Sequence, residues 1–444
     1  MVRKVSYKKI WRIEVKKIVI SSMIAVCLFG SDTITIEDAY QKALTYEAKV
    51  QSYGYQVEAK KEDIVQAKSR LYPQINLSTS ATARKYTTNY GHHDRSEQYY
   101  TLRLSAKMPI YHPEYYNNIE QSELKYKYSD IYLKQLKQEL AFNVSDAYMS
   151  IVRAKNSLFV ANAYVDANRV TYQQIKKLYD KRLANKMDLL AAKVTYDQSK
   201  IKANTEKQNL RLAKFKFKNL TNIDNANIPK INLQNIDISE LITIFKEEDL
   251  ARLNLDIKKS KINVYLTKKE IKNSSYGHYP KVDLSASSSK YDASNQYTDY
   301  SIDSTVSITF QIPIYQGGYV ESNVAKYRYL LSAANEDLKD MERKVTAKYE
   351  ELMINLNTAK ENIGLSKSTI ASANLNLKAV KKGYANGLKN LIDVENAKVK
   401  LFKAKFELID AVYTYIKSYT SLLNLYGNLN NDKLEQLDRI LFGR

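Results

Sequence analysis

The chain has 444 residues, of which only 11 are glycine and 6 are proline. So few turn-forming residues exclude a globular enzyme with many loops, and the abundant Lys, Glu, Ala, Leu and Asn are typical of long helices. The formal net charge is +21, but lysines are spread among acidic residues along helical segments. We therefore expect solvated helix surfaces rather than a nucleic-acid interface.

The N-terminus has the pattern of an export signal, which we place at residues 1–31. A basic leader precedes a short apolar core at 18–30, and small residues allow cleavage near Gly30 or Ser31. Such a core is too short to span a bilayer whose apolar part is ~30 Å thick. Lipidation of Cys27 and the true translation start both stay open. Because Cys27 is the only cysteine, the mature chain would have no thiol nucleophile, disulfide or cysteine metal site.

The first half alternates between two hydrophobic periods. Residues 34–70 have a helical pattern, and two strands with alternating apolar residues follow at about 72–86 and 99–111. A helical hairpin then covers 113–220, with an interruption near 180–187. The loop between the strands contains His92, His93 and Asp94, a weak potential metal cluster for which an ordinary solvated loop is the favoured interpretation.

The second half repeats this order. A polar linker at 223–238 precedes a helix over about 239–275, and strands are expected at about 279–291 and 300–315. A second helical hairpin covers 319–426, with an interruption near 383–390. Residues 428–444 are expected to form a C-terminal tail.

The two halves are copies of one unit. "YPQINLS" at 72 corresponds to "YPKVDLS" at 279, and "MPIY" at 108 corresponds to "IPIY" at 312. The hairpin segments that begin at Tyr179 and Tyr384 correspond at an offset of 205 residues. We therefore expect two structural repeats, 32–222 and 239–427.

Both hairpins keep a seven-residue repeat that alternates large and small residues. From Val394 to Leu425 the repeat positions read V-A-L-A-L-A-Y-S-L-L, and from Leu189 to Leu220 they read L-A-Y-S-A-E-L-A-F-L. A register kept for so long predicts knobs-into-holes packing of closely spaced helices.

Four strands cannot close a barrel, and an open sheet edge is not tolerated in lipid. Three chains would supply twelve strands, an even number within the range of outer-membrane barrels. The long helices would reach about 100 Å at 1.5 Å per residue, which suits a column below such a barrel.

With these features the chain resembles the TolC-like family of outer-membrane efflux and type I secretion proteins. The most specific local signature is Y-x-x-G-x-x-x-x-x-D-V-x-x-A, from Tyr384 to Ala397. The resemblance implies a mainly helical fold with a β-barrel portion: a homotrimer whose twelve-stranded outer-membrane β-barrel continues into a periplasmic α-helical barrel. It also implies a passive exit duct in the lipid of a Gram-negative outer membrane, served by a periplasmic adaptor and an inner-membrane pump or ABC transporter. The adaptor would dock at the hairpin tips, around 176–190 and 380–396.

The resemblance also implies a periplasmic gate at the tips. The gating tyrosine falls on Tyr384, its aspartate partner on Asp188 and the basic gate residue on Lys389, while Met187 replaces a hydroxyl-bearing partner. One acidic ring position keeps its aspartate and the other is occupied by an asparagine. The cation selectivity of the channel should therefore be weaker than with two acidic rings. These two positions are Asp393 and Asn396.

Two features of the tips have other interpretations. Asp188 and Asp393 both open a helix, where aspartate is favoured as a cap or first-turn residue whatever the function. The tip turns themselves differ, with Arg182 in the first repeat and Gly387 in the second.

The repeated "-P-I-Y-" motif marks the passage from strand to helix. A proline after the last paired position would redirect the chain, a tyrosine would sit at the barrel rim, and the next helix would start after proline or glycines. The residues concerned are Pro109, Tyr111 and Pro113 in the first repeat, and Pro313, Tyr315, Gly317 and Gly318 in the second.

Enzymatic chemistry has little support in the sequence. It contains neither a phosphate-binding glycine loop nor a nucleophile elbow, so we expect no catalysis and no cofactor. A periplasmic coiled-coil adaptor and a basic helical nucleic-acid-binding protein are the alternatives. The alternating strands argue against the adaptor and the export signal against the nucleic-acid binder. The exported substrate, drug or protein, is not defined by these residues.

Overall fold

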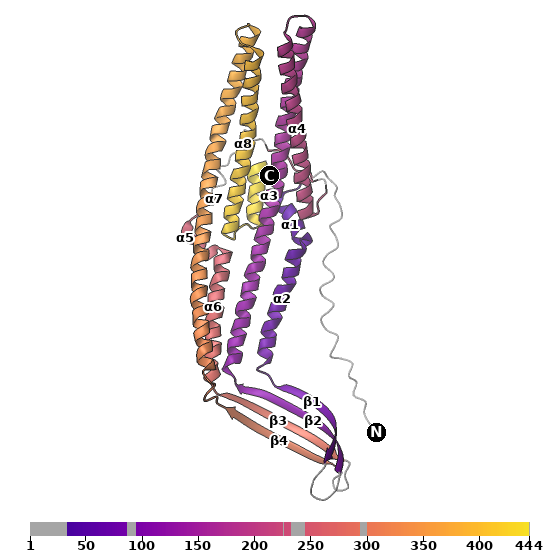
Figure 1. The fold of residues 1–444 in the computed structure, drawn as a ribbon, viewed down its shortest axis with the longest axis vertical. Coiled ribbons are helices and arrows are strands. Elements are labelled where there is room, and N and C mark those ends of the chain that lie inside the picture. The colour runs from indigo at the N-terminus through magenta and orange to yellow at the C-terminus, as the bar shows by residue number, and fades with distance from the viewer. Residues whose placement is uncertain (1–32, 87–94, 225, 232–244, 294–299, 444) are drawn as a thin grey trace.

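The computed structural model of the protein describes residues 33–86, 95–224, 226–231, 245–293 and 300–443. The expected export signal and the His92, His93 and Asp94 cluster lie outside these residues. The described chain is elongated, with a four-stranded sheet at one end and the tips of two long helical hairpins at the other (Figure 1).

The first half begins with two helices, α1 (Ile36–Tyr46) and α2 (Ala48–Ser69), where a single helix was expected. The break is at Glu47, whose extended backbone ends α1 and whose carboxylate accepts a hydrogen bond from the Lys49 N–H in the first turn of α2. The strands and the first hairpin follow as β1 (Gln74–Tyr86), β2 (Arg95–Tyr111), α3 (Pro113–Asp180) and α4 (Lys186–Thr221).

The second half has the same order of elements. Its parts are α5 (Glu247–Leu253), α6 (Leu255–Ser275), the 3-10 helix η2 (Tyr276–His278), β3 (Lys281–Ala293), β4 (Ser301–Gln311), α7 (Tyr319–Ala385), α8 (Leu391–Leu425) and α9 (Asn431–Phe442). Strand β4 ends at Gln311, four residues before the expected end at 315. Helix α9 lies in the segment that was expected to be a C-terminal tail.

The sheet is antiparallel with the order β1-β2-β3-β4, so the strand pairs of the two repeats meet at the β2–β3 contact. Its register separates two faces. One row across the four strands is apolar: Ile75, Ala106, Ala286 and Val306. The adjacent row, on the opposite face, is polar: Asn76, Ser105, Ser287 and Thr305.

The core lies where the hairpins meet the short helices, around the middle of α3 and α8. Nine of the ten repeat positions of α8 are buried, and Leu425 is half-buried, which confirms the predicted seven-residue packing. The buried set is Val394, Ala397, Leu401, Ala404, Leu408, Ala411, Tyr415, Ser418 and Leu422. The corresponding positions of α4 are all buried or half-buried.

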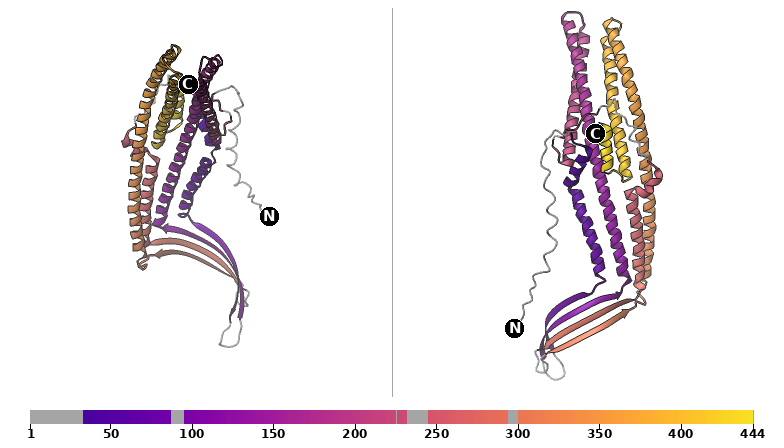
Figure 2. Two further views of the ribbon diagram at one scale, coloured as in Figure 1. Left: turned by 45° about the horizontal axis from the view of Figure 1, so that its top comes forward. Right: turned by 180° about the vertical axis from the view of Figure 1, so that it is seen from behind.

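Helix α9 packs three leucines into this same core: Leu434, Leu437 and Leu441. It lies against α1, and the views of the fold place this pair near the middle of the long hairpins (Figures 1 and 2). Over the described residues, no helix combines the length and the apolarity needed to cross a membrane.

Candidate functional site

The two hairpin tips are built from the same turn. In each, a backbone N–H donates to a carbonyl five residues earlier at 2.8 Å: Leu183 to Leu178 in the first tip and Leu388 to Gly383 in the second. The turn requires one left-handed residue, which is Gly387 with φ 74° in the second tip. In the first tip that position is Arg182 with φ 63°, where a side chain adds backbone strain.

Each tip leads into a helix that begins with an asparagine cap. The Asn185 side-chain oxygen accepts from the Asp188 N–H at 2.7 Å, and the Asn390 oxygen accepts from the Asp393 N–H at 2.9 Å. The Asp393 carboxylate also accepts from the Asn390 N–H at 3.2 Å, which completes a capping box. Both aspartates are therefore first-turn residues of α4 and α8. The caps were not singled out from the sequence, although Asn three residues before Asp was the signal for them.

Tyr384 lies between the two tips. Its ring packs against an apolar cluster formed by buried Ile175, Ala192 and Leu391, which joins α3 and α4 to α8. Burial raises the pKa of Tyr384, and the negative charge of Asp188 raises it further. The structure thus brings Tyr384 and Asp188 together.

The other expected gate residues are more exposed. The ammonium of Lys389 lies 4.0 Å from an Asp393 carboxylate oxygen within the second tip. Asn396 and Met187 are both exposed to solvent in the single chain. Lys389 is exposed as well, whereas Asp393 is half-buried.

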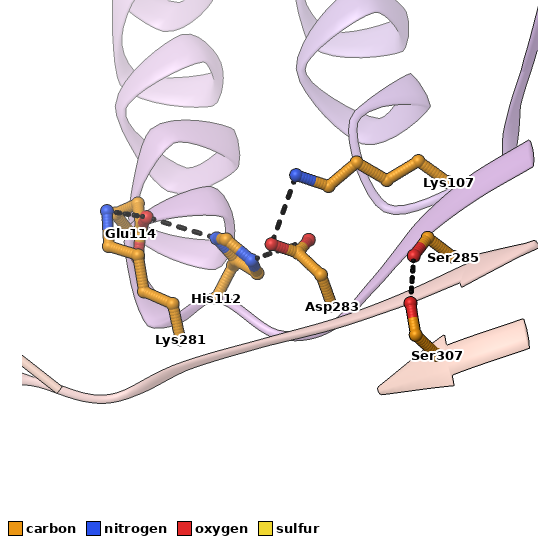
Figure 3. Close-up of polar contacts among 7 residues, drawn as sticks. All are labelled: Lys107, His112, Glu114, Lys281, Asp283, Ser285 and Ser307. Atoms are coloured by element: carbon orange, nitrogen blue, oxygen red, sulfur yellow. Dashed lines mark hydrogen bonds and ion pairs between the residues drawn. The ribbon is translucent and has the colours of Figure 1, made fainter. Parts of the chain in front are cut away.

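A second candidate site lies at the opposite end of the hairpins, where β2 passes into α3. His112 is only 7% exposed and lies between two carboxylates. Its Nδ1 is 3.2 Å from Glu114 Oε1, and its Nε2 is 3.1 Å from Asp283 Oδ1 on β3 (Figure 3). Lysines close both ends of this row, with Lys281 at 2.8 Å from Glu114 and Lys107 at 3.1 Å from Asp283.

Each carboxylate of this row lies beside a lysine ammonium that stabilises its ionised form. Burial raises the pKa of Glu114, but hydrogen bonds from Lys281, from its own backbone N–H and from His112 outweigh burial, so the pKa lies below its usual value. Each ring nitrogen of His112 lies within hydrogen-bond distance of one of the two carboxylates. The row ties β3 of the second repeat to α3 of the first. Sequence reasoning missed it because His112 and Asp283 are 171 residues apart.

The "-P-I-Y-" residues occupy different positions in the two repeats. Pro109 was expected after the last paired position, but it lies within β2 and pairs with Asp283, and the register shifts between Pro109 and Tyr111. A strand tolerates proline at such an irregularity, where a ladder hydrogen bond is already interrupted. Pro113 is the first residue of α3, and Tyr111 is the last residue of β2.

In the second repeat the motif lies beyond the sheet. Pro313 and Tyr315 follow the end of β4, and the Tyr315 side chain is 85% exposed. Gly317 and Gly318 have φ of 59° and 80°, so the turn into α7 uses two left-handed residues in succession. The first junction is therefore fixed by buried side chains and the second by backbone conformation.

Within the described ranges, no group of three or more His, Cys, Asp or Glu side chains is placed to hold a metal ion.

The sequence matches the family model described as "Outer membrane efflux protein" in two segments, residues 39–222 and 248–428. Among curated proteins, the chain is 28% identical over 269 residues to "Outer membrane protein TolC" of Escherichia coli (strain K12), a match that covers 57% of this chain and 54% of that protein. The chain thus spans about half the length of the first curated relatives it matches. It is 20% identical to "Proteases secretion protein PrtF" of Dickeya chrysanthemi, over 95% of this chain and 94% of that protein.

Solved structures share the fold over most of the chain. The outer membrane channel CmeC of Campylobacter jejuni superposes with a TM-score of 0.77 at 15% identity, covering 92% of this chain and 90% of that one. The outer membrane protein VceC of Vibrio cholerae gives a TM-score of 0.76 at 14% identity, covering 88% and 96%.

Proposed function

Because the chain belongs to the outer membrane efflux protein family, we propose that it forms the outer-membrane exit duct of an efflux pump or type I secretion system. The observation that carries this proposal is the sheet. One chain joins a four-stranded sheet with an apolar face and a polar face to two hairpins whose α3 alone is 68 residues long. The sheet suits a bilayer, and the hairpins suit a long passage that continues from it.

The sheet of one chain has two free edges, β1 and β4. Exposed edges in lipid leave backbone groups unsatisfied, and closure of the sheet into a barrel removes them. Three copies supply twelve strands, which gives a closed barrel of a size found in outer membranes. The apolar row containing Val306 would face lipid, and the polar row containing Thr305 would face the lumen.

The duct itself would be passive and would use no cofactor. Family membership supports this view, since the chain would act by enclosing a path rather than by catalysis. The relatives named for protease secretion extend the possible cargo to proteins, while the family name refers to efflux. An inner-membrane transporter and a periplasmic adaptor would supply cargo and energy, with the adaptor docked on the tips around 176–190 and 380–396. The alternative role as a coiled-coil adaptor does not account for an exposed apolar sheet face.

We assign the gate of this duct to the tips. Tyr384 packs on the apolar cluster beside Asp188, while Lys389, Asp393 and Asn396 lie on the exposed side of the second tip. The contact between Tyr384 and the first hairpin would hold the tips together, and its loss would let them part.

Assembly and conduction test the duct directly. The full chain, purified from outer membranes, should migrate as a trimer that resists mild detergent and should conduct ions across a planar bilayer. A monomer confined to the soluble periplasmic fraction, without conductance, would overturn the proposal.

The gate is tested by two variants: Tyr384→Ala removes the ring that packs on the first hairpin, and Asp188→Asn removes the charge beside it. Each should raise single-channel conductance. Asp197→Asn, on an exposed part of α4, serves as the control and should leave conductance unchanged. Conductance equal to that of the unsubstituted protein in both gate variants would refute this assignment.

A further inference from the structure

A buried ion pair within α8 lies just below the hairpin tips, and its lysine also bonds to the first hairpin. The Lys398 side chain on α8 is only 2% exposed, and its ammonium donates to Glu395 Oε1 at 2.8 Å, one turn earlier on the same helix. The same ammonium donates to Thr171 Oγ1 on α3 at 2.5 Å. Because α3 belongs to the first hairpin and α8 to the second, the Lys398–Thr171 bond crosses between them.

This contact is placed where tip separation would break it. Thr171 lies nine residues before the end of α3 at Asp180, which is roughly 13 Å of helix. Lys398 lies seven residues after the start of α8 at Leu391. The apolar cluster around Leu391 and Tyr384 lies between this ion pair and the tip turns. Helices that part at the tips must therefore separate at Lys398 once the cluster opens.

The surroundings of the ion pair are polar but incompletely satisfied. Asn168, one turn before Thr171, is 1% exposed; its side chain contacts Tyr164, but within the described chain neither amide atom has a partner in full hydrogen-bond geometry. The second carboxylate oxygen of Glu395 is buried and also lacks a partner there. Burial of unpaired polar atoms costs free energy, and contact with water removes that cost. The packed arrangement is thus held by one bond and opposed by three unsatisfied atoms.

The groups around Lys398 have opposing effects on the pKa values of this site. Burial lowers the pKa of Lys398, Glu395 opposes that shift, and the nearby Lys381 on α7 adds to it. Tyr164 on α3 lies near both Asn168 and Glu395: burial raises its pKa, the contact with Asn168 opposes that shift, and the Glu395 charge adds to it. A charge at Lys398 or Glu395 is therefore less favourable than a charge on an exposed helix surface.

A second ion pair along the same α3–α8 contact provides the comparison. Arg153 on α3 bonds Asp410 on α8 at 2.7 Å, but the two side chains are 45% and 54% exposed. Exposed pairs contribute little to stability because water competes for both charges. The Lys398–Glu395 pair differs because both side chains are buried and one Glu395 carboxylate oxygen lacks a hydrogen-bond partner.

We propose that Asn168, Thr171, Glu395 and Lys398 form a polar latch, a set of positioning residues that sets the balance between closed and parted tips. The Lys398–Thr171 bond holds the hairpins together, and the unsatisfied atoms lower the cost of separation because water reaches them once the helices part. The proposal rests on the proposed duct function and adds residues outside the expected gate.

Single-channel recording of the full chain tests the polar latch. Thr171→Val keeps the side-chain shape and removes the hydroxyl that accepts from Lys398 and donates to the Ala167 carbonyl within α3. Because only the first of these bonds crosses between the hairpins, the open probability should rise several-fold. Lys398→Met should raise it further, because it also leaves the Glu395 carboxylate buried without its partner. Adding Glu395→Gln to Lys398→Met should lower the open probability to the level of Thr171→Val, because the buried carboxylate charge is removed while the bond to Thr171 is still missing; a merely structural defect would not show this partial rescue. Arg153→Met is the matched control and should change nothing.

A readout independent of conduction uses spin labels at the equivalent tip positions, Leu183→Cys and Leu388→Cys, whose side chains are 72% and 79% exposed. The distribution of tip distances should widen in Thr171→Val and narrow in Asn168→Leu. If Lys398→Met fails to assemble, Thr171→Val decides the outcome. Unchanged open probability and unchanged distances in Thr171→Val would overturn the latch while the unsubstituted protein still conducts. An unsubstituted protein that does not conduct would instead count against the duct.

Discussion

The carboxylate of Asp438 in α9 accepts a buried hydrogen bond from the backbone N–H of Ile36, the first residue of α1, at 2.7 Å. The two residues are 402 positions apart. Next to them, the Tyr148 hydroxyl of α3 donates to the Ile34 carbonyl at 2.8 Å. These bonds fasten both ends of the described chain to the middle of the long hairpins, so α9 completes the core rather than following it.

Asp438→Ala should therefore lower the stability of the whole molecule. The substitution leaves the Ile36 N–H buried without its acceptor at a helix start, and such a loss costs about 1–3 kcal/mol. The unfolding midpoint of the purified protein in detergent measures the effect. Glu435→Ala removes an exposed pair with Arg439 on the same helix and should cost less than about 1 kcal/mol. Equal midpoints for the two variants would contradict the role given to Asp438.

The tip turns predict opposite responses to substitution in the two repeats. Arg182→Gly should stabilise the first tip by about 1 kcal/mol, because glycine adopts the left-handed backbone conformation of this position without steric strain. Gly387→Ala should destabilise the second tip by a similar amount, since open space around Gly387 leaves backbone strain as the only penalty. Hydrogen exchange of the peptides covering 176–190 and 380–396 measures each tip separately. A change of the same sign in both would refute the explanation.

At the strand-to-helix junction, His112→Phe should cost about 2 kcal/mol, because the polar contacts of both ring nitrogens with Glu114 and Asp283 are lost while the ring still stacks on Tyr115. Lys281 and Lys107 remain to balance the carboxylates, which limits the loss. The control is His278→Phe. His278 is 50% exposed and lies 3.4 Å from Glu321, so its loss should fall within about 0.5 kcal/mol. Equal effects of the two substitutions would exclude a special role for the buried histidine.

The same junction predicts an acid dependence. The pKa of Glu114 is lowered in the folded protein, so its contribution is fully present above the unfolded value of about 4.3 and is lost as the pH falls through the folded value. The unfolding midpoint of the unsubstituted protein should drop in this acidic window. Glu114→Gln should show a shallower drop there, with lower stability at neutral pH. Parallel curves for the two proteins would contradict a lowered pKa.

The elements were predictable where one hydrophobic period extends over many residues. The seven-residue repeat from Val394 and the alternation around Ile75 each depend only on local sequence, and the structure follows them. Helix α9 was missed because it is only 12 residues long and its leucines lack a visible partner in the sequence. The position of Pro109 was also missed, since an irregularity in pairing depends on the neighbouring strand.

The candidate sites were less accessible to sequence reasoning than the fold. Lysines along the helices were expected to be solvated, yet Lys398 is almost fully buried because a facing helix covers it. Its neighbour Ala397 is a repeat position, which is the local signal that Lys398 lies beside the helix contact. The roles of Tyr384 and Asp188 came from the family resemblance alone. Geometry brings the two residues together, and their gating role stays a prediction.

The sheet offers the sharpest test of how the chain meets a membrane, because neighbouring residues of β4 lie on opposite faces. Val306 belongs to the apolar row with Ala286, whereas Thr305 belongs to the polar row with Ser287. In a closed barrel, Val306→Arg would place a charge against lipid, at a cost of about 2–4 kcal/mol near the bilayer midplane. Thr305→Arg would place the same charge in the aqueous lumen at little cost.

Outer-membrane fractionation should therefore show less assembled trimer for Val306→Arg only, and Thr305→Arg should assemble normally while changing ion selectivity. Because the two sites are adjacent on one strand and receive the same residue, their strand context is matched. Equal assembly of both variants would mean that the row containing Val306 does not face lipid.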